Sequence, residues 1–134
     1  MMEPKTGAVL GLANFPTFDP NRYSDVSYER YANPAISAQY EPGSIFKIIT
    51  MAAGLDSGLF QPTTIFSDTG WIIVGGRSIF NSDRMGHGDV TATEALVRSL
   101  NVVTAQVAVG LGPEKFYSYV RRFGFGQATE VDLS

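Results

Sequence analysis

The stretch Glu41-Pro42-Gly43-Ser44-Ile45-Phe46-Lys47-Ile48-Ile49-Thr50 is a break in the chain followed at once by an apolar segment. Because proline and glycine interrupt what precedes them, we predict that a helix begins at about Ser44 and ends at Asp56-Ser57-Gly58. Residues 45–55 are apolar nearly all round, which is typical of a helix buried on every side. Lys47 is the exception within it.

Ser44 and Lys47 have the spacing of a nucleophile and its base. Residues three apart share one helix face, and free N–H groups in the first turn favour negative charge. An exposed lysine has a pKa of about 10.4, and lowering it to roughly 7 by burial corresponds to about 4.6 kcal/mol of preference for the neutral amine. The alternative is that Ser44 only caps the helix and that the Lys47 amine reaches out to solvent.

Composition excludes several classes of function. The chain has 134 residues, of which 44% are hydrophobic, so it suits one globular domain or a large piece of one. A net charge of −3 without a basic run gives no reason to expect nucleic acid or an anionic membrane as partner. There is no cysteine, and His87 is the single histidine, which argues against a zinc site and a Ser-His-Asp relay. We expect no metal and no cofactor.

The rest of the chain predicts a mixed fold of the α+β type, mostly helical, with short antiparallel strands. No apolar run has the length of a membrane span, and no signal peptide precedes the first turn. The elements expected are a turn at 3–7, a strand at 8–13, a long ordered loop at 14–43, a hairpin of 71–74 and 77–80, a helix capped by Thr91 or Thr93 that runs out near Ser99, a second helix ending at 110–112, and a third opened by Pro113 and ending before Gly124.

Ser99-Leu100-Asn101 falls where one predicted helix gives way to the next. At such a junction a hydroxyl and an amide can point into one cleft, where the hydroxyl passes a proton and the amide holds a substrate carbonyl. The alternative is that Ser99 ends one helix and Asn101 caps the following one.

The order of these motifs carries a resemblance. S-x-x-K on an apolar helix, followed by S-x-N at a helix junction, resembles the penicillin-recognising serine acyltransferases. The stretches around both motifs are similar to class B, monofunctional penicillin-binding proteins. They are Pro4 to Leu10, Asn33 to Lys47, His87 to Thr91 and Phe123 to Gly126. The resemblance implies part of a β-lactamase/transpeptidase-like fold with an incomplete antiparallel sheet.

The same resemblance implies a peptidoglycan D,D-transpeptidase. Ser44 would attack the bond between two terminal D-alanines of a stem peptide, and an amine of a neighbouring stem would resolve the acyl-enzyme. Lys47 would act as base, Ser99 would relay a proton to the leaving amine, and Asn101 would hold the substrate backbone. β-Lactam antibiotics would acylate Ser44. The parent protein would work in the cell envelope, on the outer face of the bacterial cytoplasmic membrane.

The family's third motif, K-[ST]-G, is expected after S-x-N. The one match here, Lys5-Thr6-Gly7, precedes Ser44, so we assign it no catalytic role. We therefore interpret residues 1–134 as the amino-terminal part of a transpeptidase domain and expect them to have little or no activity alone. The strand at 8–13 would keep an open edge, to which the rest of the domain or another chain could pair.

Three other hypotheses are compatible with the S-x-x-K motif. One is a β-lactam sensor, which is acylated without cross-linking anything. Another is a serine β-lactamase, which would hydrolyse the acyl-enzyme. The last is a structural α/β domain that contains both motifs by chance.

Overall fold

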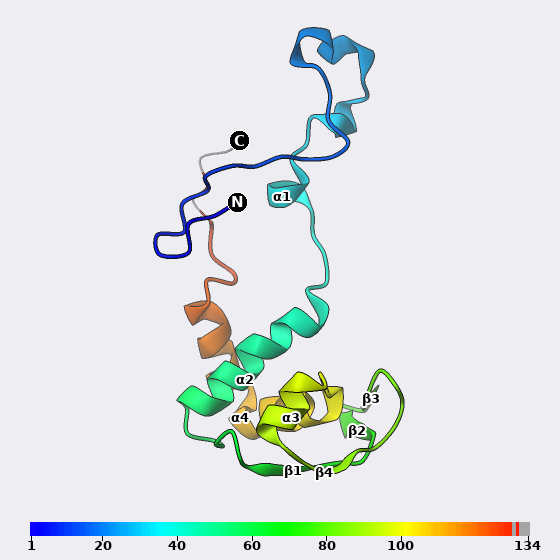
Figure 1. The fold of residues 1–134 in the computed structure, drawn as a ribbon, viewed down its shortest axis with the longest axis vertical. Coiled ribbons are helices and arrows are strands. Elements are labelled where there is room, and N and C mark those ends of the chain that lie inside the picture. The colour runs from blue at the N-terminus through cyan, green and yellow to red at the C-terminus, as the bar shows by residue number, and fades with distance from the viewer. Residues whose placement is uncertain (130, 132–134) are drawn as a thin grey trace. The chain divides into compact units, whose positions relative to one another are not determined.

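The computed structural model describes residues 1–129 and 131, and these fall into two compact units (Figure 1). The first unit comprises Met1–Glu41 and the second Pro42–Val131. All four predicted site residues belong to the second unit, so their geometry can be described within one body.

The first unit is mostly irregular. It contains 3-10 helices at Pro20–Asp25 and Tyr28–Arg30 and the four-residue helix α1, Pro34–Ser37. The turn predicted at 3–7 is present, and its Gly7 has a φ of 75°.

The strand predicted at 8–13 is wrong. The segment forms one isolated antiparallel bridge, between Val9 and Met2, and Leu10 is 64% exposed. Within the described residues no named strand pairs with it, and an apolar run becomes a strand only when its backbone groups find a neighbouring partner.

The second unit is an α+β arrangement in which two small sheets accompany the helices. Its first helical segment is a 3-10 turn at Gly43–Phe46 that continues directly into α2. The other elements follow in chain order: α2 Lys47–Asp56, β1 Ile65–Asp68, β2 Trp71–Val74, β3 Arg77–Phe80, β4 Gly88–Thr91, α3 Ala92–Val97 and α4 Asn101–Arg122. Both sheets are two-stranded and antiparallel, β1 with β4 and β2 with β3.

The predicted hairpin is confirmed in both of its strands. Gly75 and Gly76 connect β2 to β3 with φ angles of 55° and 77°, the positive values that a two-residue turn of the primed type requires. The pairing of β1 with β4 was not predicted, because Gly88-Asp89-Val90-Thr91 has the composition of a polar loop. Of these four residues only Val90 is buried.

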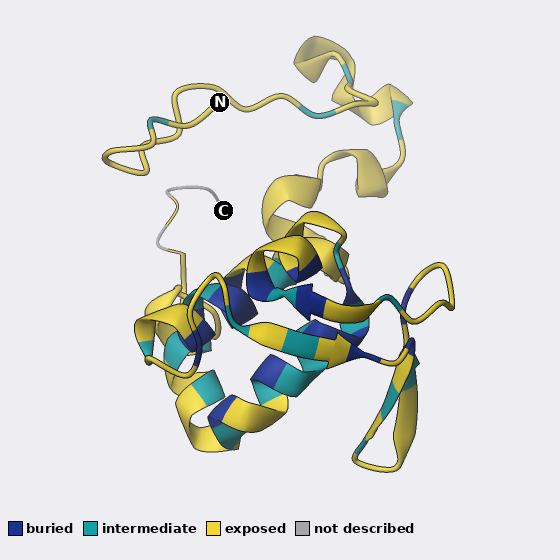
Figure 2. Cartoon of the chain, turned by 60° about the horizontal axis from the view of Figure 1, so that its bottom comes forward, coloured by how far each residue is buried: buried dark blue, intermediate teal, exposed yellow. Residues whose placement is uncertain are grey.

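The core lies between α2 and α4, with contributions from the β1–β4 sheet and α3. Figure 2 shows the buried residues gathered where these elements face one another. The main cluster consists of Met51, Ala53, Phe60, Ala92, Val107 and Leu111, and Phe66 packs against both it and a second cluster of Val90, Ala95, Leu100 and Val103.

The helical segment Gly43–Asp56 begins and ends where predicted, except that its first turn is 3-10 and α2 itself begins at Lys47, and the segment is not buried on every side. Ile45 and Ile48 are 70% and 59% exposed, whereas Met51 and Ala53 lie in the core. The apolar composition of this helix therefore reflects two different faces, one packed within the unit and one open.

The remaining helix ends follow their local signals. Thr91, rather than Thr93, caps α3 in a reciprocal capping box with Glu94. Helix α4 is broken at Gly112, whose φ and ψ are 72° and 162°, and Pro113 starts its second part as predicted. Within residues 1–129 and 131, no helix combines the length and the apolar character needed to cross a lipid bilayer.

We predict that Gly54→Ala destabilises the protein, although helix propensity alone favours alanine by about 1 kcal/mol. A Cβ at position 54 would lie 2.2 Å from Phe60 Cε1 and 2.9 Å from Val107 Cγ1, both on buried side chains. Such overpacking costs about 1–3 kcal/mol. Denaturant unfolding measures it. Gly11→Ala, at a site with no atom within 4 Å, is the control. A more stable Gly54→Ala variant would contradict the packing argument.

Candidate active site

The Lys47 side chain connects the two predicted motifs. Its Nζ donates hydrogen bonds to the Ser99 hydroxyl at 2.8 Å and to the Ser99 carbonyl oxygen at 2.5 Å, across 52 positions of sequence. Both residues are half-buried. The structure thus brings the lysine of S-x-x-K and the serine of S-x-N into direct contact.

Ser99 reaches this position because the chain reverses sharply after α3. The N–H of Ser99 bonds to the Leu96 carbonyl and that of Leu100 to the Ala95 carbonyl, which closes the end of the helix. Ser99 itself has a φ of 56°, a left-handed conformation that non-glycine residues seldom adopt. Leu100, only 3% exposed, anchors the turn in the core.

Burial lowers the pKa of the Lys47 amine from its ordinary value of 10.5. The physical cause is desolvation, which penalises the charged ammonium more than the neutral amine. This is the direction that a general base needs, because a neutral amine can take up a proton.

Ser44 lies in the 3-10 turn that leads into α2, one turn before Lys47. In a 3-10 segment residues i and i+3 eclipse one another, so Ser44 and Lys47 project from the same side of the helical segment. Ser44 is exposed, and among the described residues both hydrogen bonds of the Lys47 amine go to Ser99. Ser44 is thus three residues before the lysine that contacts Ser99, and it is open to solvent.

Asn101 is the first residue of α4, and its Nδ2 donates to the Phe80 carbonyl oxygen at 2.7 Å. The helix junction predicted at 99–101 is confirmed. Asn101 does not cap α4, as the alternative interpretation had it, because Leu100 occupies the N-cap position. The backbone N–H of Val102 donates instead to the side-chain oxygen of Asn81.

Asp68 and Asn81 were missed in the sequence, yet each is only 2% exposed and the two are hydrogen-bonded to each other. Each is the polar residue at the end of, or directly after, an apolar strand. That position was the available signal. Nothing local, however, indicates that the two strand ends meet.

His87 does not join either serine. Its Nε2 lies 2.9 Å from Asp83 Oδ2 and its Nδ1 lies 3.4 Å from Arg98 Nη1. Among the described residues the two ring nitrogens of His87 thus face Asp83 and Arg98.

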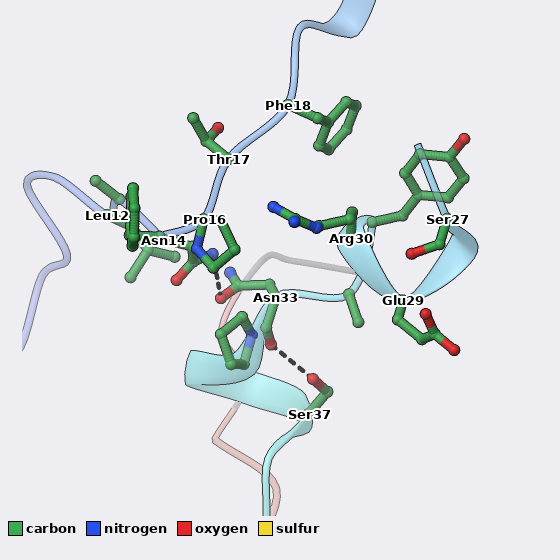
Figure 3. Close-up of a pocket in the computed structure, with 15 residues that line it drawn as sticks. Leu12, Asn14, Pro16, Thr17, Phe18, Ser27, Glu29, Arg30, Asn33 and Ser37 are labelled. Carbon is green, nitrogen blue, oxygen red and sulfur yellow. Dashed lines mark hydrogen bonds between the residues drawn. The ribbon is translucent and has the colours of Figure 1, made fainter. Parts of the chain in front are cut away.

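The first unit contains a separate hollow of about 680 Å³ (Figure 3). It is lined by Leu12 to Phe18 and by parts of 27–37, and the Asn14 amide donates to Asn33 at 2.9 Å beside it. Ser37 donates to the Asn33 carbonyl at 2.8 Å. None of the four predicted site residues lines this hollow.

Comparison with known proteins identifies the family to which the chain belongs. PbpB, a penicillin-binding protein of Mycolicibacterium smegmatis, is 38% identical over 99% of this chain and 21% of its own length. The D,D-transpeptidase domain of a peptidoglycan glycosyltransferase from Eggerthella lenta superposes with a TM-score of 0.85 at 31% identity, over 99% of this chain and 34% of the other.

An imipenem acyl-enzyme complex of penicillin-binding protein A from M. tuberculosis gives a TM-score of 0.83 at 30% identity, over 94% and 33% of the two chains. The chain spans about a fifth of the length of the curated relatives it matches. The family model described as penicillin binding protein transpeptidase domain matches residues 1–134. The chain belongs to the transpeptidase domain family of the penicillin-binding proteins.

Proposed function

We propose that this chain supplies the nucleophile, base and proton relay of a peptidoglycan D,D-transpeptidase. The observation that carries the proposal is the pair of hydrogen bonds from Lys47 Nζ to Ser99, with the solvent-exposed Ser44 three residues before Lys47 in the chain. Two groups able to move a proton are in contact there, and a nucleophile lies one helical turn away.

In the proposed reaction the neutral Lys47 amine takes the Ser44 hydroxyl proton as Oγ bonds to the carbonyl carbon between two D-alanines. The resulting oxyanion is stabilised by N–H groups. The proton then passes through the Ser99 hydroxyl to the leaving amine as the carbon–nitrogen bond breaks, which frees one D-alanine. An amine of a second stem peptide attacks the acyl-enzyme, its proton returns by the same route, and Ser44 is released.

Asn101 would hold the substrate backbone with its amide. In this structure the Asn101 Nδ2 donates to the Phe80 carbonyl, so one hydrogen of the amide is engaged and the second remains to donate to a substrate carbonyl. β-Lactams would acylate Ser44 because they resemble the D-alanyl-D-alanine end. The imipenem acyl-enzyme described for the M. tuberculosis relative supports this assignment.

The proposed site needs further protein. No K-[ST]-G sequence follows Asn101, and the family draws an oxyanion donor and carboxylate-binding groups from that box. Losing one oxyanion donor typically costs about 10² to 10³ in rate, so we propose that residues 1–134 are the amino-terminal part of the domain and inactive alone. The parent protein would act in the cell envelope.

The open face of α2 offers a place for that further protein. Ile45, Ile48 and Leu55 recur at helical spacing on this face and are 70%, 59% and 42% exposed. An apolar stripe of this kind is covered in a stable domain. We propose that the remainder of the transpeptidase domain packs on it.

We expect Ser44→Ala to abolish the covalent β-lactam adduct of the full-length protein, because no oxygen remains to bond to the lactam carbonyl. Intact-mass spectrometry after incubation with benzylpenicillin measures the adduct. Ser118→Ala, which removes an exposed hydroxyl from α4, is the matched control and keeps the adduct. An adduct that survives in Ser44→Ala would contradict the assignment of the nucleophile.

The wild-type result in the same experiment separates the related functions. A stable adduct with cross-linking of stem peptides supports the transpeptidase. A stable adduct without cross-linking indicates a sensor, and rapid turnover indicates a β-lactamase. Labelling of isolated residues 1–134 at the full-length rate would refute the proposal that they are inactive alone.

The lowered pKa of Lys47 also predicts a pH dependence of stability. Between the folded pKa and 10.5 the unfolded chain binds more protons at this group than the folded one, so stability rises with pH through that window. The unfolding free energy of wild type should therefore increase relative to Lys47→Met as pH is raised from neutrality toward 10. Denaturant titrations at several pH values measure the difference. A difference independent of pH would mean that the amine is not desolvated.

A further inference from the structure

We propose that Asp68 and Asn81 are positioning residues for the reaction: together they fix the start of α4 and thereby hold Ser99 against Lys47. The inference rests on the proposed function, because it concerns the rate at which Ser44 is acylated. Neither residue lies in the S-x-x-K or the S-x-N motif.

The two side chains form a buried polar node. The Asn81 amide donates to both carboxylate oxygens of Asp68, at 2.9 and 2.8 Å, and to the Met85 carbonyl at 2.9 Å. The Asp68 carboxylate also accepts the backbone N–H groups of Gly70 at 3.1 Å and His87 at 3.2 Å. A polar group buried this deeply is costly unless its hydrogen bonds are made, so the node is held in one arrangement.

The node is joined to α4 at its first two residues. Asn81 Oδ1 accepts the backbone N–H of Val102 at 3.2 Å, which supplies the cap that Leu100 cannot provide. The Asn101 amide donates to the carbonyl of Phe80, the residue before Asn81. The backbone N–H of Asn81 in turn bonds to the Gly70 carbonyl at 3.1 Å. The end of β3 therefore fixes both residues that begin the helix.

Close backbone packing leaves the node little freedom to shift. A Cβ at Gly70 would lie 2.7 Å from the Gly86 nitrogen, and a Cβ at Gly86 would lie 2.9 Å from the Thr69 carbonyl carbon. The segments that carry Asp68 and those that follow Asn81 are thus in backbone contact. If the start of α4 moved, the node could not move with it, so the hydrogen bonds that join the node to the helix would have to break.

Ser99 is two residues from this anchored helix start and has a left-handed φ of 56°. Its hydroxyl and carbonyl both accept hydrogen bonds from Lys47. A displacement of the helix start would therefore move both acceptors relative to the amine. Misplacement of a reacting group by about 1 Å can cost roughly 10²-fold in rate.

The test measures acylation of the full-length protein by a fluorescent penicillin, with rate constant and labelled fraction recorded separately. We expect Asn81→Ala to lower the rate constant of the labelled molecules by about tenfold or more, the scale expected of misplacement. A merely structural role would lower the labelled fraction and leave that rate constant unchanged. Leu111→Ala is the control for destabilisation, since Leu111 is buried in the core next to the Gly112 break of α4, at the other end of that helical part from Asn101. It should reduce thermal stability without changing the rate constant.

A reciprocal exchange tests the pair itself. Asn81→Asp places two carboxylates in contact and should slow acylation, whereas Asp68→Asn combined with Asn81→Asp restores one amide and one carboxylate. A carboxylate at position 81 cannot donate to the Met85 carbonyl, so the expected result for the exchanged protein is a partial recovery of the rate relative to Asn81→Asp alone, and that result supports the proposal. A wild-type rate constant in both Asn81→Ala and Asn81→Asp, or no recovery on exchange, overturns it. Absence of any adduct in wild type would instead refute the proposed function.

Discussion

The burial of one amine against one serine is the constraint on which the rest of the candidate site depends. Lys47 could satisfy its hydrogen bonds in water, yet it lies in the unit with its Nζ bonded to the Ser99 hydroxyl and carbonyl. Removing charge from water is costly, and the lowered pKa of Lys47 expresses that cost. The same contact that favours the neutral amine also sets its distance from the Ser99 hydroxyl, the relay in the proposed reaction.

Such a contact holds only if both of its sides are rigid. On one side, α2 packs against α4 through Met51, Ala53 and Val107, and Gly54 lets the helices approach closely beneath Phe60. On the other side the turn at Ser99 is held by the core residue Leu100 and by the polar groups at the ends of the strands. Apolar packing therefore fixes the base, and a buried polar network fixes the acceptor. The two halves of the site depend on different kinds of interaction.

A feature of the fold could be predicted from the sequence when it depends on residues that are close to one another in the chain. The helical segment that leads into and includes α2, the Gly75-Gly76 hairpin and a threonine cap on α3 depend on residues within a few positions, and these were predicted, although the choice between Thr91 and Thr93 as the cap was left open. The β1–β4 pairing and the contact of Asp68 with Asn81 join segments that are separated in the sequence. Nothing in either segment indicates that it meets the other. The strand predicted at 8–13 is wrong for a related reason. Its apolar residues indicate a strand, but the sequence does not show whether a partner strand pairs with it.

The exposed face of the helical segment that contains α2 shows that apolar composition alone does not predict which side of a helix is buried. Apolar residues on all sides of a helix predict complete burial, but here they divide between a face that holds the core and a face that carries Ile45 and Ile48 into solvent. Ser44 opens the same helical segment and is also exposed. In the proposed reaction the nucleophile must be reachable and the base must be partly desolvated, and one helical segment suits both demands because Ser44 is exposed in its first turn and Lys47 is half-buried where α2 begins.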